Sequence, residues 1–170
     1  MRTVRWIGLA LVVVMGPAWA GQGRLTRTPS AEFQRVAQLA GTWSGTGLMD
    51  GQESAMTIDY RVTSGGSAVV ETLFPGTDHE MVSIYHDEGG RLATTHYCAL
   101  GNQPHLVLTE SAPDHLTFTL APDSGRDAAH EPHMHALTLA WPGPNQLTQT
   151  WISYQAGQPQ PPDVFTLTRK

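Results

Sequence analysis

The sequence contains a single cysteine, Cys98, and is poor in basic residues. One thiol excludes an internal disulfide, so the stability of the fold has to come from a hydrophobic core. Ten lysines and arginines face fifteen acidic residues, which gives a net charge of −5 with neutral histidines. No polybasic stretch is present, so the chain lacks the electrostatic footprint of a protein that binds nucleic acid or an anionic membrane surface.

The sequence also lacks the short motifs that mark common catalytic sites. It has no P-loop, no GxSxG nucleophile elbow, no HExxH zinc helix and no dinucleotide-binding fingerprint. Cys98 could act as a nucleophile with His96 or His135 as its base, but the sequence identifies no orienting residue and no oxyanion hole. We therefore expect a binding protein rather than an enzyme.

The N-terminus combines two arginines in its first five residues with an apolar run over residues 7–15 and small residues up to Ala20. The run is too short to span a bilayer, so the pattern is typical of a bacterial signal peptide over residues 1–20 rather than of a retained anchor. The mature chain, residues 21–170, would be one domain of net charge −7, because it loses two of the ten basic residues. We expect it to be periplasmic or secreted, with no stable membrane insertion after cleavage.

Residues 30–39 predict a short amphipathic helix, because Ser30 suits an N-cap and Phe33, Val36 and Leu39 share a face. After it, apolar–polar alternation is interrupted by turn residues roughly every ten positions, which is typical of an all-β protein. The expected strands cover residues 42–49, 55–63, 68–74, 80–86, 92–98, 105–110, 115–120, 133–141, 146–153 and 164–168. Short connections require antiparallel neighbours, and about ten such strands close most readily into an up-and-down barrel capped by the helix.

Alternation within the strands also predicts which side chains face the inside of the barrel. Several faces begin apolar and turn polar, as expected when one end is packed and the rest is a pocket for a small apolar or mixed-polarity ligand. The expected lining is Glu71, Tyr85, His96, Cys98, His133, His135, Gln149 and Trp151. A carboxylate inside the barrel would have a raised pKa unless paired, which hints at a site. The alternative places Glu71 on the outer surface.

The histidines of HEPHMHALTL, residues 130–139, suggest an alternative function as a metalloprotein. His133 and His135 are one residue apart in an expected strand, so their side chains would share a face about 7 Å apart. His96 and Cys98 repeat that spacing. The four together would suit zinc or copper, and a histidine could hold haem iron. The two strands would lie about 15 Å apart along the wall, so the pairs could just meet across the barrel.

Two simpler interpretations remain open. The histidines can be polar groups that line a pocket and hydrogen-bond to neighbours such as Tyr85, Glu71 or Gln149. The barrel can also be filled with side chains, which would make the chain a structural or interaction protein without a site. An open interior would favour the binding function, and a packed one would favour the filled barrel.

The stretch LAGTWSGTG, residues 39–47, resembles the opening of small calycin-like barrels: lipocalins, fatty-acid-binding proteins and nitrobindins. In those families the tryptophan of the Gly-x-Trp motif closes one end of the barrel, which the resemblance implies for Trp43. Ten strands are closer to nitrobindins and fatty-acid-binding proteins than to eight-stranded lipocalins. The stretches GGSAVVETLFPGTDHEMVSIYH, THYCALGNQP and HMHALTL are similar to a group of small exported bacterial proteins of unassigned function.

The ligand-binding groups of these families do not carry over to this sequence. Nitrobindins hold haem through a histidine near the last strand, but the expected last strand, VFTLTRK, contains none. Fatty-acid-binding proteins use two arginines deep in the barrel, whereas Arg61 and Arg169 are expected to point outward or lie at the terminus. The resemblance therefore implies a fold, and it leaves the ligand and any zinc, copper or haem cofactor open.

Overall fold

A computed structural model describes residues 28–49, 51–124 and 127–170. The expected signal peptide, residues 1–20, and residues 21–27 of the expected mature chain lie outside this part. Within the described residues, no helix has the length and apolar character needed to cross a membrane.

A short helix, α1 (Ala31–Ala37), precedes the strands. The Ser30 side chain accepts a hydrogen bond from the backbone N–H of Phe33 at 3.0 Å, and its own hydroxyl donates to Asp87 at 2.6 Å. Phe33 and Val36 are buried against the barrel. The predicted helix over residues 30–39 is confirmed, with slightly tighter bounds, and its N-cap also fastens it to a neighbouring strand.

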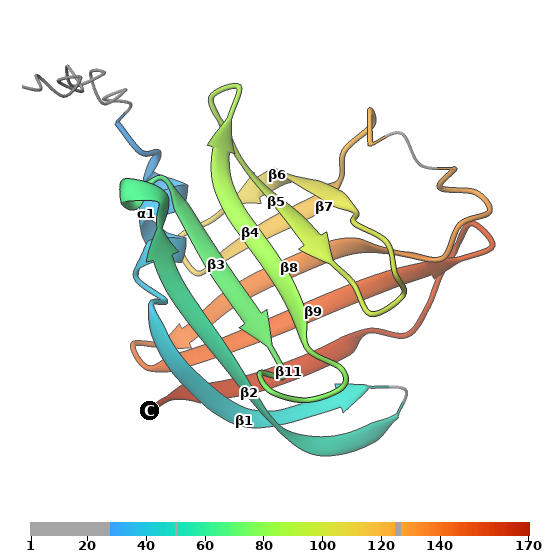
Figure 1. Cartoon of the computed structure of the whole chain (residues 1–170), viewed down its shortest axis with the longest axis horizontal. Coiled ribbons are helices and arrows are strands. Elements are labelled where there is room, and N and C mark those ends of the chain that lie inside the picture. Colours follow the sequence, from blue (N-terminus) through green and yellow to red (C-terminus); the bar gives the residue numbers. More distant parts are fainter. Residues whose placement is uncertain (1–27, 50, 125–126) are drawn as a thin grey trace, which may run out of the picture.

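Eleven strands follow in the described residues. They are β1 (Gly41–Met49), β2 (Gln52–Thr63), β3 (Ala68–Leu73), β4 (Met81–Glu88), β5 (Arg91–Tyr97), β6 (His105–Ser111), β7 (His115–Leu120), β8 (His133–Gly143), β9 (Gln146–Gln155), β10 (Gln158–Pro159) and β11 (Asp163–Arg169). From β1 to β9 each strand pairs antiparallel with the next. Strand β11 then pairs with both β9 and β1, which closes the barrel (Figure 1). Since β10 is a two-residue extension beside β9, ten longer strands of the described chain form the wall, and the predicted all-β barrel is confirmed.

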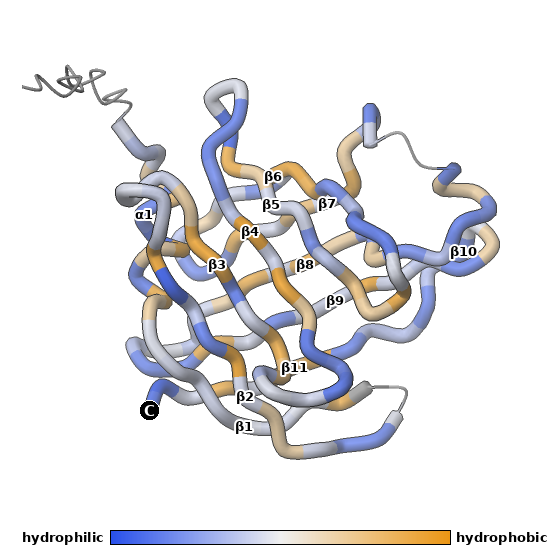
Figure 2. Tube along the Cα trace, viewed as in Figure 1, coloured by the Kyte–Doolittle hydropathy of each residue, from blue (hydrophilic) through white to orange (hydrophobic). Residues whose placement is uncertain are grey.

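The strands alternate buried and partly exposed side chains, as a wall with one packed face requires. In β3, Val69, Glu71 and Leu73 are buried and their neighbours are not. Figure 2 shows the same interleaving of apolar and polar positions along the other strands. The buried face points into the barrel, so the hydrophobic core fills the interior.

One end of the barrel, which we call the helix end, carries α1 (left in Figure 1). The buried Trp43 side chain packs at this end, next to the chain that leaves α1. The Trp43 indole N–H donates to the Leu39 carbonyl at 2.7 Å. The Arg169 guanidinium lies 4.4 Å from the centre of the Trp43 ring and donates to the carbonyls of Gln38 and Ala40, both at 2.7 Å. Trp43 therefore closes this end, as the calycin-like resemblance implies.

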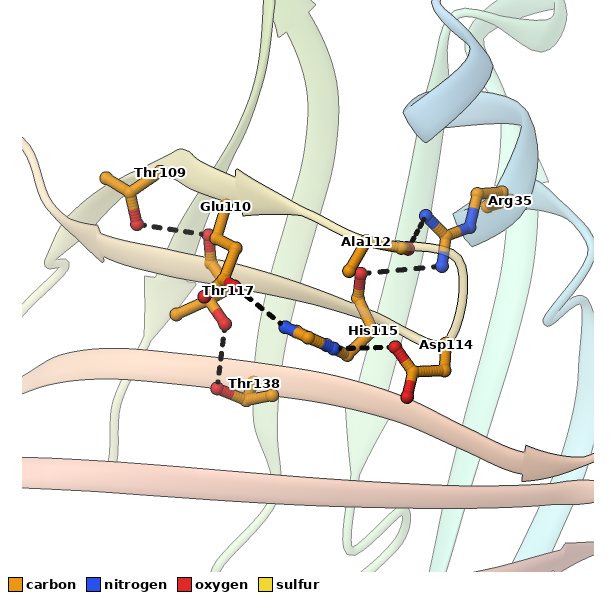
Figure 3. Close-up of polar contacts among 8 residues, drawn as sticks. All are labelled: Arg35, Thr109, Glu110, Ala112, Asp114, His115, Thr117 and Thr138. Carbon is orange, nitrogen blue, oxygen red and sulfur yellow. Dashed lines mark hydrogen bonds and ion pairs between the residues drawn. The ribbon is translucent and has the colours of Figure 1, made fainter.

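A second arginine fastens α1 to the turn between β6 and β7 (Figure 3). Arg35 donates to the Ala112 carbonyl at 2.7 Å, and its guanidinium lies 4.5 Å from the centre of the Trp141 ring. In the same turn the His115 ring contacts Asp114 at 2.9 Å and Glu110 at 3.3 Å. These carboxylates raise the pKa of His115.

The opposite end of the barrel, which we call the loop end, carries the connections that follow β5, β7 and β9.

Candidate functional site

A row of polar side chains crosses four neighbouring strands inside the barrel. The register places Tyr60 of β2 opposite Glu71 of β3, Glu71 opposite Ser83 of β4, and Ser83 opposite His96 of β5. All four side chains are buried. Because directly opposite residues in an antiparallel sheet project from the same face, the row forms one continuous polar strip on the inner wall.

Two side chains of β9 reach this strip from the opposite wall. The Trp151 indole N–H donates to the Gln149 side-chain carbonyl at 2.9 Å, and the Gln149 amide donates to Glu71 Oε1 at 2.5 Å and to the Tyr60 hydroxyl. Tyr60 in turn donates to Glu71 Oε1 at 2.5 Å, and Tyr85 donates to Glu71 Oε2 at 3.0 Å. We call these residues, together with Ser83, Thr94 and His96, the polar layer.

Glu71 is the centre of the polar layer and its exposed fraction is 0%. Burial raises the pKa of its carboxyl, while hydrogen bonds from Tyr60, Ser83, Gln149 and Tyr85 lower it and offset part of that rise. Burial and the charge of Glu71 also raise the pKa of both tyrosine hydroxyls well above the usual value. Both tyrosines therefore keep their protons at neutral pH and act as hydrogen-bond donors.

His96 lies at the edge of the layer toward the loop end. Its Nδ1 is 3.0 Å from the Ser83 hydroxyl, and its ring centre is 4.7 Å from that of Trp151. Burial lowers the pKa of His96 from 6.5 to about 4, so the ring is neutral at pH 7. In the described part of the chain, His96 Nε2 and Thr94 Oγ1 are buried atoms with no hydrogen-bond partner. The interior of the barrel thus holds unused polar atoms.

The structure brings together five of the eight expected lining residues. These are Glu71, Tyr85, His96, Gln149 and Trp151, each with at most 1% of its surface exposed. The prediction that Glu71 faces inward is therefore confirmed. The side chains of the layer contact one another directly rather than surrounding an open space. This packing is the outcome expected for a filled barrel, so binding at the layer requires its side chains to move apart. A hollow of about 620 Å³ lies elsewhere, between β1, β2 and the chain that follows β3.

The expected inward orientation of His133 and His135 was wrong. A β-bulge inserts one extra residue between Met134 and Ala136, so His133 pairs with Tyr154 and Met134 pairs with Ser153. Met134 takes the inward parity of Trp151 and packs against the core. His133 Nδ1 lies 2.7 Å from the Glu131 carbonyl, its Nε2 is 3.1 Å from His135 Nδ1, and His135 stacks on Tyr154 at 3.8 Å. By register the pair lies on the outer face of the wall, where His133 is nevertheless fully buried, at 0% exposed, in contact with His135, Tyr154 and the Glu131 carbonyl.

The four donors expected for a metal are not gathered at one place. His96 is inside the barrel, and Cys98 follows the end of β5 in a turn. By register the other two histidines lie on the outer face of the wall, with His133 buried there. Among the described residues, no three His, Cys, Asp or Glu side chains are grouped as a metal ion would require. Haem fits no better, because the Trp151 ring packs against His96 and the surrounding layer is closed.

Tyr60, Ser83 and Thr94 belong to the layer but are absent from the expected lining. Strand alternation carries the signal that would have found them, because Tyr60 shares parity with Ile58, and Thr94 with His96. Ser83 shares parity with Tyr85 in the same way. Small hydroxyl side chains attract little notice in a sequence, although Ser83 is the link between the acid and the histidine.

Comparisons with known proteins support the fold and leave the family open. No protein-family model matches the chain, and no curated protein is similar to it. Among solved structures, the crystal structure of Rv2717c from M. tuberculosis is similar, with a TM-score of 0.56 and 16% sequence identity over 84% of this chain and 99% of that one. At this identity the likeness concerns the fold alone. The closed antiparallel barrel is consistent with the calycin-like resemblance.

Proposed function

We propose that the chain is an exported β-barrel that binds a small ligand of mixed polarity at the polar layer. The observation that carries the proposal is the buried His96 ring, whose Nε2 has no partner although Nδ1 is held by Ser83. A buried polar atom left unpaired costs about 1–3 kcal/mol. A barrel wall that serves only as a scaffold would gain stability from an apolar residue at this position, so the histidine is better explained by a ligand that pairs with it.

The surroundings of His96 supply both kinds of contact that a ligand of mixed polarity needs. The Trp151 ring offers an apolar surface beside the free nitrogen, and the Thr94 hydroxyl offers a second polar atom from the same face of β5. Ligand pockets commonly combine an apolar lining with a few placed polar groups. The layer has this composition, while the helix end of the barrel is apolar apart from groups that are already paired.

A ligand would reach the layer from the loop end. Met81 and Met134 are partly buried there and pack against the core. Methionine side chains are unbranched and flexible, so they can rearrange at low cost and open a passage that is closed in the described conformation. Export itself is inferred from the N-terminal sequence, with its basic start, short apolar run and small residues before Gly21.

Native mass spectrometry of the full chain, expressed in a bacterium and collected from the periplasm, tests the proposal. We expect a small organic molecule that is bound under native conditions and lost on denaturation. A His96→Phe variant should lose at least about nine-tenths of this adduct, because the hydrogen bond and the fit both disappear. A His79→Phe variant, which alters an exposed histidine, should keep it.

Two results would contradict the proposal. One is the absence of any adduct in the unmodified protein, and the other is an adduct that His96→Phe leaves at full occupancy. The mass of the denatured protein also shows at which residue the chain begins. A mass that begins at Gly21 supports cleavage after Ala20, and a mass that retains residues 1–20 contradicts export by a cleaved signal peptide.

A further inference from the structure

Hydrogen-bond directions in the polar layer determine what His96 offers to a ligand. An indole N–H can only donate, so the carbonyl oxygen of Gln149 faces Trp151 and its amide N–H groups face Tyr60 and Glu71. The Tyr60 hydroxyl accepts from this amide and gives its own hydrogen to Glu71. Tyr85 donates to the other oxygen. Glu71 is therefore an acceptor toward each of these three neighbours.

Ser83 links Glu71 to His96 through hydrogen bonds. It lies directly opposite Glu71 across the β3–β4 pair. When Glu71 is ionised, a hydrogen bond between the two has the Ser83 hydroxyl as its donor, and this bond lowers the pKa of Glu71. The Ser83 oxygen then accepts from the N–H at His96 Nδ1, 3.0 Å away. A neutral imidazole with its hydrogen on one nitrogen carries a lone pair on the other. In this arrangement His96 Nε2 is a hydrogen-bond acceptor.

The charges around the layer restrict the ligand further. Among the described residues no lysine or arginine is buried, and the buried acid is Glu71. An anionic ligand would be buried beside a carboxylate with no cation to pair with, which is strongly unfavourable. An ammonium would bring three N–H groups to a place where one nitrogen and the Thr94 hydroxyl are unpaired. Neither kind of ion can be satisfied there.

We propose that the interior site takes an uncharged ligand with an apolar ring or body against Trp151 and an O–H or N–H group that donates to His96 Nε2. This inference rests on the proposed function and names its ligand class. Alcohols, phenols and neutral amides fit the class, and fatty acids do not. Glu71 and Ser83 act as positioning residues, because they orient the histidine and need not touch the ligand.

Four small probes of nearly the same size test the inference on the unmodified protein at pH 7: phenol, benzene, benzoate and benzylammonium. Binding can be followed by calorimetry or by the fluorescence of the tryptophans. We expect phenol to bind about fivefold more tightly than benzene, as one added neutral hydrogen bond predicts. Benzoate and benzylammonium should bind at least about tenfold more weakly than phenol.

Variants assign the difference to His96. In His96→Phe, phenol should bind no more tightly than benzene, whereas the exposed-site control His79→Phe should keep the preference. Benzoate binding as tightly as phenol, or a preference for phenol that survives in His96→Phe, would overturn the inference while leaving a ligand-binding barrel intact. Failure of all four probes to bind would instead count against the proposed function, and the inference would fall with it. If His96→Phe does not fold, the order of the four probe affinities in the unmodified protein still tests the inference.

Discussion

The helix end and the polar layer of the barrel are both buried, yet their polar atoms are satisfied differently. At the helix end the Trp43 indole has a carbonyl partner, and Arg169 covers the ring and donates to two further carbonyls. In the layer, Glu71 accepts several hydrogen bonds, but His96 and Thr94 each keep an unpaired atom in the described structure. The polar groups named at the helix end all have partners, whereas the layer keeps two unpaired atoms.

This difference separates the helix end, which stabilises the fold, from the polar layer, which we propose binds a ligand. The helix end combines a large apolar ring with local hydrogen bonds, so changes there should lower the free energy of unfolding and leave ligand preference unchanged. In the layer, burial disfavours the charged forms of both Glu71 and His96, so the contribution of these groups to stability depends on pH. Changes there should alter pH dependence and binding more than they weaken the fold.

The largest effect on stability is expected for Trp43→Ala. This side chain is 1% exposed and closes the helix end, so its removal leaves a cavity and should lower the free energy of unfolding by about 3–5 kcal/mol. Urea denaturation of the mature chain measures the change. Leu100→Ala, at a residue that is 57% exposed, is the control and should change it by less than about 0.5 kcal/mol. A loss below about 1 kcal/mol in Trp43→Ala would show that the helix end is not the stabilising region.

The next largest effect should come from the titration of His96. Its pKa is about 4 in the folded protein and near 6.5 when exposed, so the unfolded chain binds the proton more readily. The stability that this group contributes is present above pH 6.5 and lost as the pH falls toward 4, by about 3 kcal/mol in total. Urea unfolding of the unmodified protein and of His96→Phe, which cannot titrate here, should diverge over this window. Parallel pH profiles would show that His96 is not buried in a neutral form.

A smaller effect of opposite sign is expected for Glu71, because hydrogen bonds offset part of its burial. Its pKa is raised in the folded protein, so the folded state holds the proton more readily than the unfolded chain. The stability that it contributes is therefore present below its ordinary pKa and lost as the pH rises through the raised value. Compared with Glu71→Gln, the unmodified protein should become less stable as the pH rises from about 4 to 7. The reverse trend would mean that the hydrogen bonds outweigh burial.

Most of the barrel could be predicted from the sequence, because its strands follow local rules. Glycine and proline turns limit each strand, and alternation then sets the inward face. The inward placement of Glu71, Tyr85, His96, Gln149 and Trp151 follows from alternation within single strands. Trp43 needed the calycin-like resemblance in addition, since a tryptophan near the start of a strand does not by itself predict a closed end.

The errors arose where alternation is interrupted. The bulge at His135 reverses the faces of the residues before it, and no local residue type in HMHAL announces an inserted position. Strand β5 ends at Tyr97, so Cys98 enters a turn instead of continuing the face of His96. Contacts across the barrel, such as Gln149 with Glu71, depend on how the sheet closes and could not be read from any single strand.

The protonation of the His96 ring tests the central claim most directly. Nitrogen-15 spectra of the histidine side chains at pH 7 distinguish a ring with its hydrogen on Nδ1 from one with its hydrogen on Nε2, and His96→Phe assigns the signal. We predict the hydrogen on Nδ1, with an Nε2 resonance that shifts when phenol is added. A hydrogen on Nε2, unchanged by phenol, would contradict the account and favour a barrel filled with side chains and without a ligand site.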